Sequence, residues 1–355
     1  MTNAPAIPGG SIQDGPAQSG SVQPGVAAPG PTRAQRGGFG RFLIRRVLQA
    51  LAVVLVVSVI VFALLHALPG GPARGVLGQQ ASAEQIAAFE AANGLDQPVV
   101  LQYLSFLGRS LTGDLGESYL LNQSVADAIA VRLPKTLLLT GLSLVVAVLV
   151  AVPVGVYQAV RRNRAVDYWF STLAIVAYST PTFFLGMLLI LLLSQTAGLF
   201  PAAAPQGSGV LEVLSQPAGL VLPVLTGAVP IVATFSRYMR SSTLDNLGED
   251  YVRTARAKGT AYRAVVLRHV LRNSLTPVVA MLGYYLPVMF GGALVVEQLF
   301  NYPGMGLLFW SAAQSSDFPV LLGCVLVISV ATVVGSLLAD VVQALLDPRT
   351  RGAAR

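Results

Sequence analysis

The sequence predicts an all-α polytopic membrane protein with six transmembrane helices and both termini in the cytoplasm. The first observation is composition: 54% of the 355 residues are hydrophobic and 11% are charged, whereas about a quarter of the residues in soluble proteins are charged. The second is the uneven distribution of Lys and Arg along the chain. The third is a set of apolar runs of spanning length, at 43–67, 136–160, 168–194, 218–237, 275–296 and 319–346.

The positive charges predict the orientation of these helices. With a cytoplasmic N-terminus, all but four of the 23 Lys and Arg fall in cytoplasmic segments, as the positive-inside rule requires. The net charge of +7 is thereby explained without a nucleic-acid partner, since no soluble domain interleaves basic with aromatic residues. The four exceptions are Arg74, Arg109, Arg132 and Lys135.

Composition also divides the chain into a tail and a membrane domain. Residues 1–40 are rich in Gly, Pro, Ser and Gln without an apolar period, which predicts a disordered cytoplasmic tail. The apolar run after the basic cluster at 41–46 is long enough to span, so we expect a retained membrane helix and no cleaved signal. Residues 41–351 are expected to form one transmembrane domain, with a short cytoplasmic tail at 352–355.

The segment 68–135 is the one sizeable region predicted outside the membrane on the outer side. Ser82 and Gln85 form a capping box for a short helix that ends near Asn93-Gly94. We expect the segment to cover the outer mouth of the bundle or to contact a partner, and simple packing over the helices explains it equally well. Further turns are predicted at Gly113-Asp114 and Gly116.

The cytoplasmic loop 240–275 is the longest strongly polar segment in the second half of the chain. Its first part predicts a short helix, because Glu249 and Asp250 suit the positive end of a helix dipole. The bases Arg253, Arg256 and Lys258 suit the opposite end. Gly259 follows, where a left-handed residue ends a helix at little cost for glycine.

A second helix is predicted after Gly259, with Thr260 as its cap. Its apolar stripe, Tyr262, Val266 and Val270, opposes several arginines, which suits a helix that lies on an anionic membrane face and rises into the next span. The alternative is a positively charged loop that only fixes topology. Two ordered helices joined at a glycine are more than topology requires.

The chain has no predicted energy source of its own. An ion-coupled carrier needs ionisable groups in mid-membrane, whereas His66, Glu297 and Asp317 lie at outer ends and Asp340 lies toward the cytoplasmic end of its run. A phosphate-binding loop needs a glycine-rich turn that ends in Gly-Lys-Ser/Thr, and neither lysine of the chain stands in one. We therefore expect an external motor that binds the basic loop.

Catalysis is not predicted either. Two histidines, His66 and His269, and the single cysteine, Cys324, are far apart in the sequence and form neither a metal set nor a nucleophile triad. Cys324 lies in an apolar run, where it is expected to be a small packing residue. The sequence predicts no catalytic, metal or cofactor site in this chain.

Several stretches resemble one known family, the membrane-spanning permeases of bacterial ATP-binding-cassette importers of the oligopeptide, dipeptide and nickel branch. The resemblance covers about residues 41–351, and Gly71 replaces the usual acid after the first helix. The stretches, in chain order, are FLIRRVLQAL, HALPGGPA, NGLDQPVVLQYLSFLGRSLTGDLGESY, RLPKTLLLT, YSTPTFFLGMLLILLL, VVEQLFNYPGMG and ALLDPRTR.

The basic loop resembles the EAA motif of that family, which forms the coupling helix bound in a groove of the ATPase subunit. Arg253-Thr254-Ala255 stands in place of Glu-Ala-Ala, and Gly259 is the motif glycine. Arg272 occupies the position of a frequent proline, with Pro277 following instead. The resemblance implies that the coupling residues are Asp250, Tyr251, Val252, Arg253, Thr254, Ala255, Arg256, Ala257, Lys258, Gly259 and Thr260.

The resemblance further implies the type I importer fold and the assembly around it. The chain is expected to pair with a second related permease and to bind two cytoplasmic ATPase subunits, which would hold ATP and Mg. A periplasmic or lipid-anchored binding protein would deliver substrate to this multi-pass protein of the bacterial inner membrane. Transport would then proceed by alternating access between two states of different affinity for ATP.

The expected function is therefore that of a peptide permease subunit without ATPase activity of its own. Another solute of the same branch, such as a nickel complex or a glycoside, is an alternative, as are a motor-independent carrier or channel and a membrane anchor for soluble partners. Small residues of the third to fifth helices are candidates for the translocation path, although close helix packing explains them equally. These candidates are Ser179, Thr180, Pro181, Gly283, Tyr284 and Tyr285.

Overall fold

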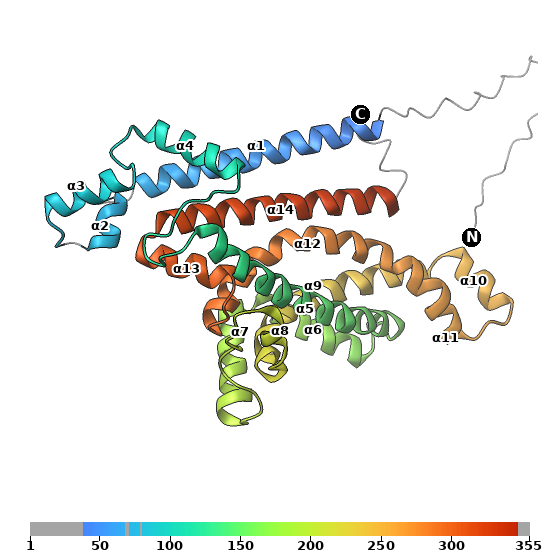
Figure 1. Ribbon diagram of the computed structural model, residues 1–355. Coiled ribbons are helices and arrows are strands. Elements are labelled where there is room, and N and C mark those ends of the chain that lie inside the picture. The colour runs from blue at the N-terminus through green and yellow to red at the C-terminus, as the bar shows by residue number, and fades with distance from the viewer. Residues whose placement is uncertain (1–37, 68–70, 79, 347–355) are drawn as a thin grey trace, which may run out of the picture.

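The computed structural model describes residues 38–67, 71–78 and 80–346 (Figure 1). Helices account for nearly all of this part of the chain, and no strand occurs within it. The predicted tail at 352–355 and all but the last three residues of the predicted tail at 1–40 lie outside the described residues. Five helices are long: α1 (Gly38–His66), α5 (Val125–Val160), α9 (Pro217–Leu247), α12 (Leu271–Leu299) and α14 (Phe318–Leu346).

Each of the six predicted apolar runs is helical, but the span count is not thereby decided. Within the described residues, four helices are long and apolar enough to cross a membrane, namely α1, α5, α9 and α14. A bent pair of shorter helices raises the number to five if it forms one span. Six spans with both termini inside therefore stay a prediction.

The bent pair corrects the prediction of one continuous helix at 168–194. The chain instead forms α6 (Ala165–Ser179), α7 (Thr182–Leu189) and the π-helix η1 (Ile190–Thr196), with a bend of 109° between the first and the rest. Pro181 lies at the break and Thr180 before it is extended, with φ −79° and ψ 124°. The residue before a proline is disfavoured in the α conformation, which accounts for the site of the break.

The helix that contains the second predicted span, 136–160, begins before that span. α5 begins at Val125, well before residue 136, because the Ser124 side chain accepts a 3.0 Å hydrogen bond from the Asp127 amide and caps the helix. Pro134 lies inside α5 and does not end it.

The predicted turns of the outer segment are confirmed. Three helices form it: α2 (Gly71–Leu77), α3 (Ala83–Ala92) and α4 (Val99–Leu111). Ser82 and Gln85 exchange the two hydrogen bonds of a capping box at the start of α3, at 3.2 and 2.9 Å. Positive φ angles occur at the three expected glycines, Gly94, Gly113 and Gly116.

The centre of the bundle is the contact between α5 and α9. Every fourth residue of α5 on this side is small or polar and buried, so the two helix backbones approach closely. A Cβ atom on Gly155 would lie 2.7 Å from the Ser236 carbonyl oxygen and 3.0 Å from the Arg240 amide nitrogen. The stripe on α5 consists of Ser143, Ala147, Ala151, Gly155 and Ala159.

The remaining helices surround this pair and separate the two ends of the bundle. α12 packs against α9 and α14, and α14 packs against α1. Figure 1 shows α2, α3 and α4 at one end of the long helices, together with α13 (Met305–Ser315). The opposite end carries α10 (Asp250–Ala257) and α11 (Tyr262–Val265). The connection before α9 contains the short α8 (Val210–Leu214).

Candidate functional site

The first helix of the basic loop forms as predicted and ends at Gly259. α10 has Glu249 as its N-cap, Asp250 in its first turn and Arg256 in its last. Gly259 has φ +79°. Its amide donates to the Arg256 carbonyl at 2.9 Å and the Thr260 amide donates to the Ala255 carbonyl at 3.2 Å, which is a Schellman motif.

The second helix differs from the prediction in two respects. Thr260 is not its cap, because α11 begins at Tyr262 with Ala261 as N-cap and without a side-chain capping bond. α11 continues through the π-helix η2 (Val266–Val270) directly into α12. The second loop helix is therefore continuous with α12, and this continuity attaches the loop directly to the bundle.

The valines of the predicted membrane-facing stripe are buried inside the loop. Val252 of α10 packs with Val265 and Val270, and Val266 is also buried. Of the predicted stripe only Tyr262 is largely exposed. The interpretation of the stripe valines as a membrane contact is therefore wrong, because Val266 and Val270 are both buried within the protein and Val270 packs with Val252 of α10.

Polar contacts complete the attachment of α10. The Tyr251 hydroxyl donates to Asn246 Oδ1 at 2.8 Å, across the turn that joins α9 to α10. The guanidinium of Arg256 lies 5.4 Å from the ring centroid of Tyr262, a cation–π contact that bridges the two helices beside Gly259. The ion pair of Arg253 with Asp250, at 3.1 Å, is exposed and contributes little.

The opposite face of α10 is open to solvent. Arg253, Thr254, Arg256, Ala257 and Lys258 are all exposed, whereas Val252 is buried on the other side. The helix thus presents a short, basic, solvent-exposed face on a rigid base. Such a face can bind a complementary surface of another protein without a change in the bundle.

The six path candidates fall into two groups, one at the break between α6 and α7 and one on α12. Ser179, Thr180 and Pro181 form the break between α6 and α7. Gly283 lies directly against Ala339 of α14, where a Cβ atom would collide, and the Tyr285 ring stands edge-on to Phe235 at 5.0 Å. The side chain of Tyr284 lies outside the described residues. Assignment of these residues to a translocation path stays a prediction.

A buried carboxylate at the end of the bundle that carries α13 was not predicted as a functional group. Glu297 accepts hydrogen bonds from the Thr136 hydroxyl at 2.6 Å and from the amide of Gly306 at 2.6 Å. Leu307 adds a third amide at 3.1 Å. The carboxylate therefore caps α13 and joins it to α5 and α12, a favourable place for a negative charge.

Tyr302 supports the same junction. Its hydroxyl donates to the Lys135 carbonyl at 2.8 Å, and burial raises the pKa of Tyr302, so the donor proton is retained. The Lys135 ammonium donates to the Gly207 carbonyl at 2.6 Å. The available sequence signal is the stretch VVEQLFNYPGMG, in which an acid precedes a Gly-rich helix start.

The several apolar helices of spanning length define a multi-pass membrane component, which carries an exposed basic loop at one end of its bundle. Residues 151–352 match the family "Binding-protein-dependent transport system inner membrane component", and residues 39–140 match the N-terminal part of such components. The chain therefore belongs to this family of inner-membrane transport components, which confirms the predicted resemblance to permeases of ATP-binding-cassette importers.

Curated relatives extend the similarity over nearly their whole length. The oligopeptide transport system permease protein AppB of Bacillus subtilis (strain 168) is 36% identical over 310 residues, which is 87% of this chain and 98% of the relative. The glutathione transport system permease protein GsiC of Escherichia coli (strain K12) is 38% identical over 310 residues, with the same coverage. The homologues are transport components and not enzymes.

Proposed function

We propose that this chain is a permease subunit of an ATP-driven importer, forms half of the translocation path for peptides, and is driven by ATPase subunits that bind α10. The observation that carries the proposal is the exposed basic face of α10 on a buried apolar base, at the end of the bundle opposite α2, α3 and α4. The names of the relatives, which include an oligopeptide and a glutathione permease, support a peptide substrate.

The proposal includes the predicted topology and partners. Six spans with both termini in the cytoplasm accord with the positive charges at 161–164 and 253–272. The first end of α1 and the last end of α14 lie toward the end of the bundle that carries α10, in further accord with it (Figure 1). A second related permease would complete the path. Two ATPases would hold ATP and Mg, and a binding protein would deliver substrate to the α2–α4 end.

Two features would let α10 transmit force: the Schellman motif at Gly259 and the packing of Val252 against Val265 and Val270. Because α10 is attached both to the end of α9 and, through α11, to the start of α12, its displacement would move both helices. ATP binding would change the population of two states of the bundle through this attachment. The chain itself need perform no chemistry.

The decisive experiment is uptake by the reconstituted transporter. The permease pair, the ATPases and the binding protein are placed in proteoliposomes, and uptake of labelled dipeptides, oligopeptides and glutathione is measured with ATP or a non-hydrolysable analogue. We expect uptake of at least one peptide with ATP only. Equal uptake in ATP-free, ion-loaded vesicles without the ATPases would overturn the proposal in favour of a carrier or channel.

The same vesicles distinguish among the solutes of this branch. ATP-dependent uptake of a nickel complex or a glycoside, without uptake of any peptide, would support the assignment as an importer and contradict the assignment of a peptide substrate. The matched control is an assembly that lacks the binding protein, in which ATP-dependent uptake is expected to disappear.

A further inference from the structure

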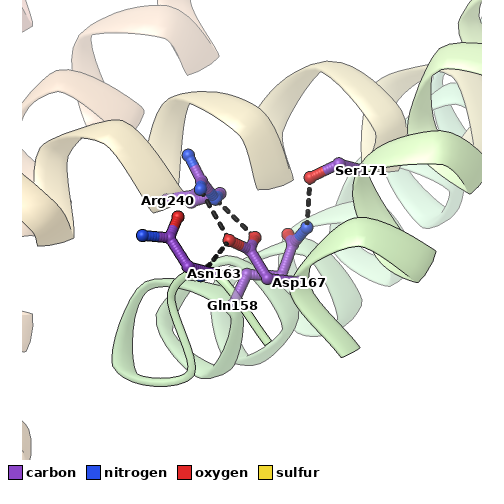
Figure 2. Close-up of polar contacts among 5 residues, drawn as sticks. All are labelled: Gln158, Asn163, Asp167, Ser171 and Arg240. Carbon is purple, nitrogen blue, oxygen red and sulfur yellow. Dashed lines mark hydrogen bonds and ion pairs between the residues drawn. The ribbon is translucent and has the colours of Figure 1, made fainter. Parts of the chain in front are cut away.

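A bidentate ion pair joins the start of α6 to the last part of α9. Arg240 Nε donates to Asp167 Oδ1 at 2.7 Å and the second guanidinium nitrogen donates to Oδ2 at 2.7 Å (Figure 2). The Asp167 side chain is 3% exposed and that of Arg240 is 28% exposed. Parallel, charge-assisted bonds of this kind define both the distance and the relative orientation of the two helices.

The turn between α5 and α6 is built around the same carboxylate. Asn163 has φ +61°, and its amide donates to Asp167 Oδ2 at 3.0 Å. The Asp167 amide donates to the Arg164 carbonyl at 2.9 Å. The carboxylate thus holds its own turn with one oxygen and Arg240 with both, so the turn and α9 share a single anchor.

Close backbone packing places Arg240 at this anchor. The α9 backbone passes directly over Gly155 of α5, where a Cβ atom would lie 3.0 Å from the Arg240 amide nitrogen. About two turns later α9 ends at Leu247, and α10 follows after a short turn. The ion pair therefore lies between the core of the bundle and the loop that we propose as the ATPase attachment.

Two buried side-chain oxygen atoms near the pair lack a hydrogen-bond partner, although the Gln158 amide nitrogen donates to the Ser171 hydroxyl at 3.3 Å. Within the described part of the chain, Gln158 Oε1 and Thr243 Oγ1 are the buried side-chain polar atoms without a hydrogen bond. Gln158 lies next to Asp167 (Figure 2), and Thr243 belongs to the turn of α9 after Arg240. Unsatisfied buried polar atoms disfavour a local arrangement, and the ion pair opposes that cost together with the close packing of α5 against α9.

On the basis of the proposed function, we propose that Asp167 and Arg240 are positioning residues of energy coupling. The pair makes the turn 161–164 and the α10 end of α9 move as one body when an ATPase displaces α10. Without the pair, α9 would slide or bend against α5 at Gly155, and the displacement would dissipate before it reached the middle of the bundle.

The first test separates coupling from assembly. Asp167→Asn, Arg240→Gln and the double variant are reconstituted with their ATPases and binding protein, and the amount of complex, ATP hydrolysis and solute taken up per ATP are measured. We expect the single variants to lower uptake per ATP by about 2- to 30-fold, with ATP hydrolysis retained. This factor corresponds to the change in coupling free energy that mutations between two coupled sites typically cause. A proportional loss of complex, hydrolysis and uptake at an unchanged ratio would show a structural role only and overturn the proposal.

Conservative variants supply the matched controls. Arg240→Lys keeps the charge and loses the planar fork, so uptake per ATP is expected to lie between that of Arg240→Gln and the unsubstituted protein. Arg237→Gln, one turn earlier on α9 at an exposed position, is expected to leave the ratio unchanged. An equal effect of Arg237→Gln would contradict a specific role of the pair.

The second test needs no transported solute, and it leaves Asp167 and Arg240 unsubstituted. Spin labels on cysteines at the exposed positions of Arg162 and Arg253 report the distance between the turn and α10 in the assembled transporter, without nucleotide and with a non-hydrolysable ATP analogue. We expect one distance in both states. A shift on nucleotide binding would overturn the proposal, and it would do so whatever the substrate proves to be.

Discussion

The Glu297 carboxylate accepts a 2.6 Å hydrogen bond from the backbone amide of Gly306, which joins the end of α12 to the start of α13. A second oxygen accepts from the Thr136 hydroxyl of α5. Two consecutive helices, α12 and α13, and the distant α5 therefore meet on one buried side chain, so its removal has a predictable cost.

Glu297→Ala is expected to lower the free energy of unfolding by about 1–3 kcal/mol for each buried donor left without an acceptor. Thermal unfolding of the assembled complex in detergent measures this loss. Glu117→Ala is the control, because Glu117 is exposed on the outer segment, and its effect is expected to stay within about 0.5 kcal/mol. Equal losses for the two variants would argue against the junction.

Gly259→Val is expected to abolish ATP-driven uptake while membrane insertion is retained. Nothing lies within 4 Å of a Cβ atom at this position, so the cost arises from the φ of +79° and not from a clash. A β-branched residue in that conformation costs about 1–3 kcal/mol, which opens the Schellman motif and releases α10. Uptake and the amount of membrane-inserted protein are measured together.

Two controls accompany Gly259→Val. Gly259→Asn is expected to retain most uptake, since Asn tolerates the left-handed conformation. Gly209→Val is expected to be silent, because Gly209 has φ −130° and open space around a Cβ atom. Normal uptake by Gly259→Val would refute the coupling role of this turn.

Reversal of charge at Arg256 and Lys258, both to Glu, is expected to weaken binding of the ATPase subunits to the exposed face of α10. Each residue is exposed, so the fold of the permease should persist. The affinity of the isolated ATPase for proteoliposomes that contain the permease is the measurement, with a stronger effect at low salt. Reversal of charge at Arg161 and Arg164, in the turn between α5 and α6, is the control. An identical loss of ATPase affinity there would indicate general electrostatic attraction instead of a specific site.

Val252→Thr tests the base under α10. The substitution keeps the volume and places a hydroxyl among Val265 and Val270, at a cost of about 1–3 kcal/mol if the group stays unpaired. Hydrogen exchange of the α10 amides is expected to accelerate, whereas the long helices keep their protection. Ala257→Ser on the exposed face of the same helix should leave exchange unchanged, and faster exchange in both variants would reject the buried base.

Local signals predicted much of the loop and of the outer segment. The capping box at Ser82 and the left-handed Gly259 depend on hydrogen bonds within a few residues, so sequence spacing suffices to find them. Thr260 shows the limit of the method, because a residue with a capping side chain was available and the helix began two residues later.

Contacts between distant segments could not be predicted from the sequence. Asp167 and Arg240 are 73 positions apart, and Thr136 and Glu297 are 161 apart. No periodicity links such pairs, since they meet only after helix packing. The apolar stripe after Gly259 was assigned to the membrane surface, whereas its valines are buried within the protein, because sequence patterning cannot distinguish lipid from another helix as the cover.

Proline illustrates what each level of structure decided. Hydropathy and the conformational freedom of glycine act locally, so the amino-acid pattern was enough to predict the apolar helices and the turn at Gly259. Pro153 and Pro230 remain inside helices, whereas the helix breaks at Pro181. The restriction on the residue before a proline applies at all three positions, so the difference depends on packing: beyond the 109° bend, Gly186 of α7 fits closely against Leu299 and Thr226.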